Sequence, residues 1–207
     1  MRTADQWMSV LTACGVKIEV AQQWGPVFAD TVKDDTFAGG DAEIDDFLGQ
    51  VLVECAMLTK FEENLHYSAE RLMAVWPHRF PTLEAAAPFA NNPKALANNV
   101  YGGRMGNVQP DDGWTFRGQG VPMLTGRSNY ETIGVLMGQD LTTNPDMLQQ
   151  PHYSLEAAIA FWKARVPQNS LGNCKLVTYH FNGGNIGLSD RESCTALATG
   201  ALVCANS

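Results

Sequence analysis

The feature that most constrains this chain is residues 53–68, a short stretch that carries three glutamates between two predicted helices. Upstream, apolar residues recur at three- and four-residue steps through residues 42–57, which predicts one buried helical face. Downstream, Ser68 is the expected N-cap of a helix over residues 69–76. Glu54 therefore falls near the end of an apolar helix, where burial favours the protonated carboxyl that a general acid needs.

The spacing of the acids limits what they can do together. Glu54 and Glu63 are nine residues apart, and at about 100° per residue an unbroken helix would put them on opposite faces. They can serve one site only if the chain leaves the helix between them, an arrangement that suits a glycosidase with two carboxylates. Ordinary solvated acids would show the same spacing, and Glu62 competes with Glu63 for the second role.

This stretch is the first of four sequence blocks that follow one another along the chain. They are Val53-Glu54-Cys55 with Glu63-Asn64-Leu65-His66-Tyr67-Ser68-Ala69, then residues 97–107, residues 112–130 and residues 181–191. In this order they resemble glycoside hydrolase family 19, the chitinase-like family that includes many phage endolysins. Its pattern has His-Glu-Ser, then Glu-Asn-Leu-Asn-Tyr-Ser-Ala nine residues after the first Glu, followed by Tyr-Ala-Asn-Arg-x-Gly-Asn, Gly-Arg-Gly…Gln-Leu-Thr-Gly-Arg-x-Asn-Tyr and Ile-Asn-Gly-Gly-x-x-Gly-Leu-x-Asp-Arg.

The resemblance implies a fold and a domain organisation. The expected fold is mainly α: a lysozyme-like, two-lobed α-helical domain with a central cleft and little or no β structure. We expect residues 1–207 to form a single catalytic domain of this family, without a separate wall-binding module. The length agrees with one domain, because chains of this size usually have a single core.

The resemblance also implies a reaction and its residues. The reaction is hydrolysis of a β-1,4 link between N-acetylated sugars with inversion, in which an acid and a base lie about 6.5–9.5 Å apart. By position in the motifs, Glu54 is the acid, Glu63 is the base and Thr125 helps to hold the attacking water. The candidate substrate-binding residues are Asn129, Tyr101, Arg104, Trp114, Asn182 and Arg191. Two interpretations of Trp114 fit the sequence equally well: its ring stacks on a sugar, or its ring is packed into the wall of the cleft.

Several positions depart from the family pattern. Val53 stands where His is usual, Ala56-Met57 where Gly-Gly often follows, His66 where Asn is common, and Met123 where Gln is common. Cys55 replaces Ser; we expect a small buried residue there rather than a thiol nucleophile. Because both carboxylates and Thr125 remain, we expect an active enzyme with altered rate or substrate preference.

Composition excludes several classes of protein. The formal net charge is −8, with 14 basic and 22 acidic residues and no Lys/Arg cluster, which argues against nucleic-acid binding and attachment to anionic membranes. No apolar run reaches about 18 residues and the start lacks an apolar signal region, so we expect no stable membrane insertion and folding in a cytoplasm. The five cysteines match no zinc motif and suggest reduced, mostly buried thiols. We expect no cofactor and no metal.

The remaining pattern predicts further helices. They cover residues 4–14, 18–32 (kinked or divided at Gly25-Pro26), 83–90, 94–101, 126–137, 155–165 (capped by Ser154) and about 190–204. Residues 102–113 are a predicted loop, and residues 115–124 are predicted to be extended or irregular. Residues 175–181 alternate in polarity and fit a strand or a helix, and the resemblance favours a helix.

The substrate remains a choice between two polysaccharides. The blocks look closer to endolysins of phages or prophages of Gram-negative bacteria, which favours peptidoglycan glycan strands, cut between N-acetylmuramic acid and N-acetylglucosamine. A chitinase is the first alternative and a non-catalytic glycan-binding relative the second. As an endolysin, the protein would be a monomer made in the host bacterial cytoplasm that reaches the cell wall in the periplasm through a holin.

Overall fold

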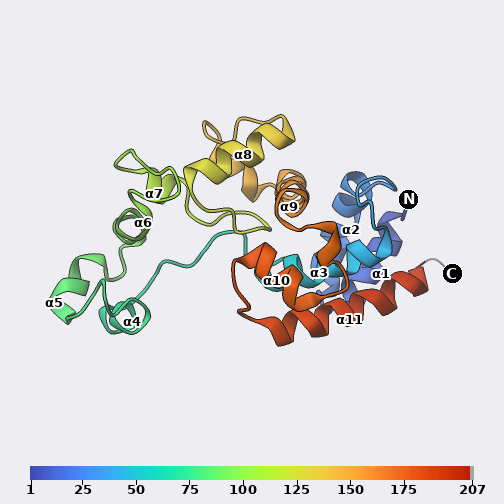
Figure 1. The fold of residues 1–207 in the computed structure, drawn as a ribbon, viewed down its shortest axis with the longest axis horizontal. Coiled ribbons are helices and arrows are strands. Elements are labelled where there is room, and N and C mark those ends of the chain that lie inside the picture. Colours follow the sequence, from blue (N-terminus) through green and yellow to red (C-terminus); the bar gives the residue numbers. More distant parts are fainter. Residues whose placement is uncertain (206–207) are drawn as a thin grey trace. The chain divides into compact units, whose positions relative to one another are not determined.

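The computed structural model describes residues 1–205, and they are mainly helical (Figure 1). The α-helices are α1 (Ala4–Ala13), α2 (Ile18–Thr31), α3 (Asp41–Glu54), α4 (Ala69–Val75), α5 (Leu83–Ala86), α6 (Pro93–Tyr101), α7 (Asp112–Thr115), α8 (Arg127–Met137), α9 (Pro151–Arg165), α10 (Cys174–Asn182) and α11 (Leu188–Ala205). Three short 3₁₀ helices are η1 (Ala87–Phe89), η2 (Pro145–Gln149) and η3 (Gln168–Ser170). Over these residues there is no β-strand, only isolated bridges from Gln119 to Glu62 and to Leu124. The expected mainly-α fold is confirmed.

The chain divides into two compact units. The first comprises residues 1–61, 120–123 and 146–207, and the second comprises residues 62–119 and 124–145. Each unit has its own buried apolar cluster. The second unit therefore is an insertion between α3 and α9, apart from the four residues 120–123 that return to the first.

The first unit is organised around α3, which packs along α11. Gly49 permits this close approach, because a Cβ there would lie 1.9 Å from Thr195 Oγ1 and 3.1 Å from the Arg191 carbonyl oxygen. On another side of α3, the Phe47 ring contacts Trp162 of α9 edge-on, with ring centroids 5.6 Å apart. Burial of these apolar faces, rather than helix propensity alone, stabilises α3.

The second unit is a set of short helices whose starts carry side-chain caps. Ser68 accepts a hydrogen bond from Arg71 N–H at α4, and Thr82 accepts one from Ala85 N–H at α5. Asn92 does the same for α6, where Pro93 occupies the first turn. The cluster beneath these helices contains the buried side chains of Leu65, Leu72, Phe80, Ala86, Leu96, Ala97 and Val100.

Some sequence predictions of individual elements were wrong. Of the two alternatives predicted at Gly25-Pro26, a kink or a division, division is wrong, because α2 runs from Ile18 to Thr31 with Pro26 inside it. Ser154 is not an N-cap: α9 begins earlier, at Pro151, and the buried Ser154 Oγ accepts a hydrogen bond of 2.7 Å from Val121 N–H. This bond ties residues 120–123 to the first unit. The predicted loop 102–113 also runs into α7, a single turn that the sequence pattern did not indicate.

One other prediction of an element is confirmed. The ambiguous segment 175–181 is helical, as part of α10, with Val177, Thr178 and Phe181 buried. Among residues 1–205, the structure has no helix of the length and hydropathy needed to span a membrane.

Candidate active site

Glu54 belongs to the first unit and is the last residue of α3. Cys55 forms the C-cap, and the next three residues, Ala56, Met57 and Leu58, all have positive φ of 49° to 60°. The chain therefore leaves the helix directly after Glu54, as its spacing from Glu63 requires. The Glu54 side chain is 22% exposed, and its Oε2 accepts a 2.6 Å hydrogen bond from Arg191 Nη2.

Arg191 is held at several points besides Glu54. Its side chain is 4% exposed, Nη1 donates to Gln50 Oε1 at 3.0 Å and to the Gln50 carbonyl oxygen at 3.2 Å, and Nε donates to the Ile186 carbonyl oxygen at 3.3 Å. The guanidinium therefore connects the end of α3 with the loop before α11. Arg191 was predicted to shape the site or bind substrate, and its contacts make it a residue that orients Glu54.

Asn182 lies at the end of α10 and is half-buried. The next residue, Gly183, closes the helix in the left-handed conformation with φ of 73°, a position that favours glycine. The Asn-Gly-Gly turn thus directs the chain into the 183–187 loop, whose Ile186 carbonyl contacts Arg191. The predicted substrate contact of Asn182 stays a prediction.

Glu63 belongs to the second unit, where two donors orient its carboxylate. Oε2 accepts a 2.6 Å hydrogen bond from the Tyr101 hydroxyl, and Oε1 accepts a 2.6 Å hydrogen bond from Gly118 N–H. Burial, together with the charge and hydrogen bond of Glu63, raises the pKa of the Tyr101 phenol above its usual range. The phenol therefore stays protonated and is a donor to Glu63.

Gly118 brings Glu63 close to Thr125. A Cβ on Gly118 would lie 3.2 Å from Thr125 Oγ1 and 3.4 Å from both Cβ and Cδ of Glu63. The backbone at residue 118 thus occupies the narrow space between the two side chains, and its N–H faces the carboxylate. The structure brings together the predicted base and the residue predicted to hold its water.

Glu62, the competitor of Glu63, has a different environment. Its Oε1 accepts a 2.7 Å hydrogen bond from Arg117 Nε, and Arg117 in turn lies 4.1 Å above the Trp114 ring. Arg117 Nη1 also donates to the Trp114 carbonyl oxygen at 3.0 Å. Trp114 is therefore packed under a guanidinium, which agrees with the interpretation of this residue as a wall.

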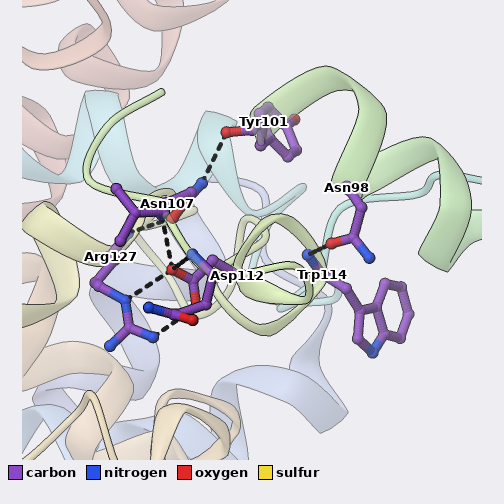
Figure 2. A network of polar contacts seen from close by, with 8 residues as sticks. Asn98, Tyr101, Asn107, Asp112, Trp114 and Arg127 are labelled. Carbon is purple, nitrogen blue, oxygen red and sulfur yellow. Dashed lines mark hydrogen bonds and ion pairs between the residues drawn. The ribbon is translucent and has the colours of Figure 1, made fainter. Parts of the chain in front are cut away.

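A polar network joins Asn107 and Asp112 to Arg127, which follows Thr125 by two residues (Figure 2). Asn107 Nδ2 donates to the Tyr101 carbonyl oxygen at 3.1 Å, and its Oδ1 accepts from Arg127 N–H at 2.8 Å. Asp112 accepts hydrogen bonds of 2.9 and 2.5 Å from the Arg127 guanidinium and two more from the N–H groups of residues 108 and 109. The end of α6 is thereby connected to the start of α8.

Asn129 and Arg104 lie at the borders of this network. Asn129 Nδ2 donates to the Thr125 carbonyl oxygen at 2.6 Å, and Arg104 is exposed just beyond α6. The sugar contacts predicted for both residues, and for Tyr101, remain predictions.

Cys55 is a buried thiol beside Glu54. Burial raises its pKa to about 12, so it stays protonated at neutral pH, and its Sγ donates to the Val51 carbonyl oxygen at 3.0 Å. This agrees with a packing role. Within residues 1–205, no group of three or more His, Cys, Asp or Glu side chains has an arrangement suited to a metal ion.

Comparison with known proteins identifies the family. No family model matches the sequence. A "Glycosyl hydrolase family 19 domain-containing protein" of Haemophilus influenzae is 31% identical over 147 residues, which cover 70% of this chain and 72% of that protein. The chain belongs to glycosyl hydrolase family 19. It is therefore a chitinase-like glycoside hydrolase.

Plant endochitinases match shorter parts of the chain. An acidic endochitinase of Petunia hybrida is 34% identical over 94 residues, covering 45% of this chain and 32% of its own. The acidic 27 kDa endochitinase of Solanum lycopersicum is 46% identical over 48 residues, covering 23% and 19%. Among solved structures, chitinase C from Streptomyces griseus HUT6037 has a TM-score of 0.57 over 97% of this chain and 92% of its own, at 17% identity.

For this family 19 chain, the structure adds residues that the motif comparison did not single out. They are Gln50, which contacts Arg191, Gly118, which contacts Glu63, and Asn107, which joins α6 to α8. Gln50 left a local sequence signal, a polar side chain four residues before Glu54 on a largely apolar helix, and Asn107 and Gly118 stand inside two of the four sequence blocks. The contacts of Gly118 and Asn107 join segments that are far apart in sequence, so no local pattern predicts them.

Proposed function

We propose that this chain hydrolyses the β-1,4 bond between N-acetylmuramic acid and N-acetylglucosamine in peptidoglycan, with inversion of the anomeric carbon. Membership of glycosyl hydrolase family 19 supports a glycosidase. The observation that carries the proposal is that two glutamates, nine residues apart, are each oriented by short hydrogen bonds to groups that cannot take their proton. In this mechanism Glu54 is the acid and Glu63 the base.

On the acid side, Arg191 decides which oxygen of Glu54 reacts. A guanidinium has only N–H donors, so the Oε2 atom that faces Arg191 accepts a hydrogen bond and has no proton to give. The transferable proton therefore sits on Oε1. As the bond breaks, Oε1 protonates the leaving oxygen, and Arg191 stabilises the carboxylate that forms.

On the base side, each oxygen of Glu63 has one protein donor. A carboxylate offers about four lone-pair sites, so the bonds from Tyr101 and Gly118 leave acceptor capacity for a water. Thr125, across Gly118, supplies a hydroxyl that can hold that water. Glu63 takes a proton from the water as it attacks the sugar, and the fixed donors reduce the reorganisation this step needs.

Peptidoglycan is the favoured substrate because of where the similarity lies. The bacterial relative matches 70% of this chain, whereas the tomato and petunia endochitinases match 23% and 45% of it. The blocks around Glu63 and Thr125 also resemble those of bacterial-virus endolysins. In that setting the protein acts as a monomer on the cell wall, after release from a bacterial cytoplasm through a holin.

Chitin is the second candidate substrate. It is favoured by the names of the plant relatives, which are endochitinases, and by the fold likeness to a chitinase of Streptomyces griseus. Both polymers offer a β-1,4 bond next to an N-acetylated sugar, so the same two glutamates serve either one.

The test is hydrolysis of purified Gram-negative peptidoglycan and of chitin oligomers, with mass spectrometry of the products and NMR of the new anomeric centre. New reducing ends at N-acetylmuramic acid with inverted configuration are expected. Cleavage of chitin alone would replace the substrate, and retention of configuration would exclude the mechanism. Binding of either glycan without cleavage would make this a glycan-binding relative.

The residue assignment has a matched control in the neighbouring carboxylate. Glu54→Gln and Glu63→Gln should each reduce kcat by about 10²–10⁴-fold, because each removes one proton-transfer group. Glu62→Gln should keep most of the activity, since Glu62 contacts Arg117 instead. Equal losses in Glu62→Gln and Glu63→Gln would contradict the assignment of the base.

A further inference from the structure

Gln50 lies one helical turn before Glu54 on α3. Residues four apart face the same side of a helix, so the two side chains point toward the same neighbour, α11. Gln50 is 0% exposed. A buried amide must be hydrogen-bonded to be tolerated, so its partners indicate why it is there.

The carbonyl side of that amide holds Arg191. Gln50 supplies two acceptors to Arg191 Nη1, its side-chain Oε1 at 3.0 Å and its main-chain oxygen at 3.2 Å. The neighbouring Nη2 of the same guanidinium contacts Glu54 at 2.6 Å. Because a guanidinium is planar and rigid, fixing Nη1 also fixes the direction in which Nη2 points.

The amino side of the amide reaches a third helix. Gln50 Nε2 lies 3.9 Å from Cys174 Sγ, at the first residue of α10. This contact turns the amide so that its oxygen faces Arg191. Cys174, Gln50, Arg191 and Glu54 thus form a continuous chain of contacts across α10, α3 and α11.

Gln50 also suits this position because its side chain carries no charge. A carboxylate at this position would pair with Arg191 and compete with Glu54 for its charge. An apolar side chain would leave Nη1 with only the main-chain oxygen. The glutamine orients the guanidinium and leaves its charge directed at Glu54.

We propose that Gln50 is a positioning residue for catalysis, which acts through Arg191 to hold Glu54 in the orientation for proton transfer. This inference rests on the proposed role of Glu54 as the general acid. It assigns a function to a residue that touches neither the substrate nor the reacting atoms. Its loss should therefore affect the chemical step and leave glycan binding unchanged.

The first variant is Gln50→Met, which keeps the volume and removes the acceptor. We expect kcat to fall about tenfold to a hundredfold with KM and glycan binding close to wild type, because misplacing a catalytic group costs rate rather than ground-state binding. Asp46→Asn is the matched control: Asp46 is also buried on α3 but contacts Gly172 N–H, so kcat should not change. A thermal melt of each variant checks folding.

A double-mutant cycle with Arg191→Lys separates positioning from packing. If Gln50 acts through Arg191, Gln50→Met in the Arg191→Lys background should lower kcat no further, whereas independent effects would multiply. Should Gln50→Met not fold, Gln50→Glu keeps the side-chain length and is expected to lower kcat by drawing Arg191 away from Glu54.

The outcomes distinguish this inference from the function on which it rests. Unchanged kcat in a folded Gln50→Met variant of an active enzyme overturns the inference and leaves the proposed function intact. Multiplicative losses in the cycle, or a rise in KM alone, also overturn it. If the wild type cleaves neither peptidoglycan nor chitin, the proposed function fails first and the positioning role fails with it.

Discussion

At the scale of single residues, two adjacent glutamates have different chemistry because their partners differ. Glu62 is bound by a guanidinium that packs on an indole ring. Glu63 is bound by a phenol and a backbone N–H, beside the Thr125 hydroxyl. The neutral donors orient Glu63 without pairing its charge, which suits a base better than an ion pair does.

Tyr101 was expected to contact sugar. Its hydrogen bond to Glu63 predicts instead that it acts on the rate through Glu63. Tyr101→Phe removes one hydrogen bond to a charged group, which is worth about 1.5–3 kcal/mol. We expect kcat to fall by about tenfold to a hundredfold with little change in KM. Steady-state kinetics on the glycan that the wild type cleaves measures both constants.

Tyr179→Phe is the control for this variant. Tyr179 is exposed on α10 and its ring centroid lies 5.9 Å from that of His180, so loss of its hydroxyl should leave kcat unchanged. A rise in KM with unchanged kcat in Tyr101→Phe would show that Tyr101 acts on the sugar rather than on Glu63.

At the scale of elements, the end of α3 decides where Glu54 lies. The helix stops at Glu54, and residues 56–58 then adopt the left-handed conformation. Non-glycine residues are strained in this region. The family resemblance places Gly-Gly near this point, where Ala56-Met57 here adopts the left-handed conformation at a cost in stability.

Ala56→Gly should therefore stabilise the protein. Ala56 is exposed and has φ of 49°, so glycine relieves about 1 kcal/mol of strain, less the greater freedom it has when unfolded. Denaturant melts should show a higher midpoint. Ala196→Gly, at an exposed position inside α11, should lower the free energy of unfolding by about 1 kcal/mol, and equal losses in both variants would contradict the strain argument.

At the scale of the whole molecule, the two units carry carboxylates that respond to pH in opposite ways. In the first unit, burial is the main cause that raises the pKa of Asp46. In the second unit, the hydrogen bond from Arg127 is the main cause that lowers the pKa of Asp112. Because a group shifts stability wherever its pKa differs between folded and unfolded chains, the two residues have opposite signs.

The sign for each residue follows from proton binding. The folded chain holds the Asp112 proton less tightly than the unfolded chain, so Asp112 stabilises above about pH 4 and that contribution is lost as the pH falls. The folded chain holds the Asp46 proton more tightly, so ionised Asp46 destabilises at neutral pH, and this cost disappears as the pH falls through its raised pKa.

Two asparagine variants test this difference. At pH 7, Asp112→Asn should lower the free energy of unfolding by about 1.5–3 kcal/mol, because it loses charged hydrogen bonds to Arg127, whereas Asp46→Asn should raise it. Both differences from wild type in the free energy of unfolding should become smaller as the pH falls. Urea melts from pH 3 to pH 7 measure them, and a pH-independent difference for either variant would show that charge is not the cause.

The sequence by itself determined the helical content and the caps of α4 and α5. These depend on local pattern: apolar periodicity along α3, and Ser68 and Thr82 at helix starts. It did not determine Ser154, which the pattern marks as a cap and which instead accepts a bond from Val121.

Only the tertiary structure decided the partners of the two carboxylates. Glu54 meets Arg191 across 137 positions, Glu63 meets Gly118 across 55 and Tyr101 across 38. No local preference encodes such contacts, because they form when α3 packs on α11 and when residues 62–63 meet residues 118–119. The sequence therefore supplies the two glutamates, and the tertiary structure supplies the neighbouring groups that determine the chemistry of each one.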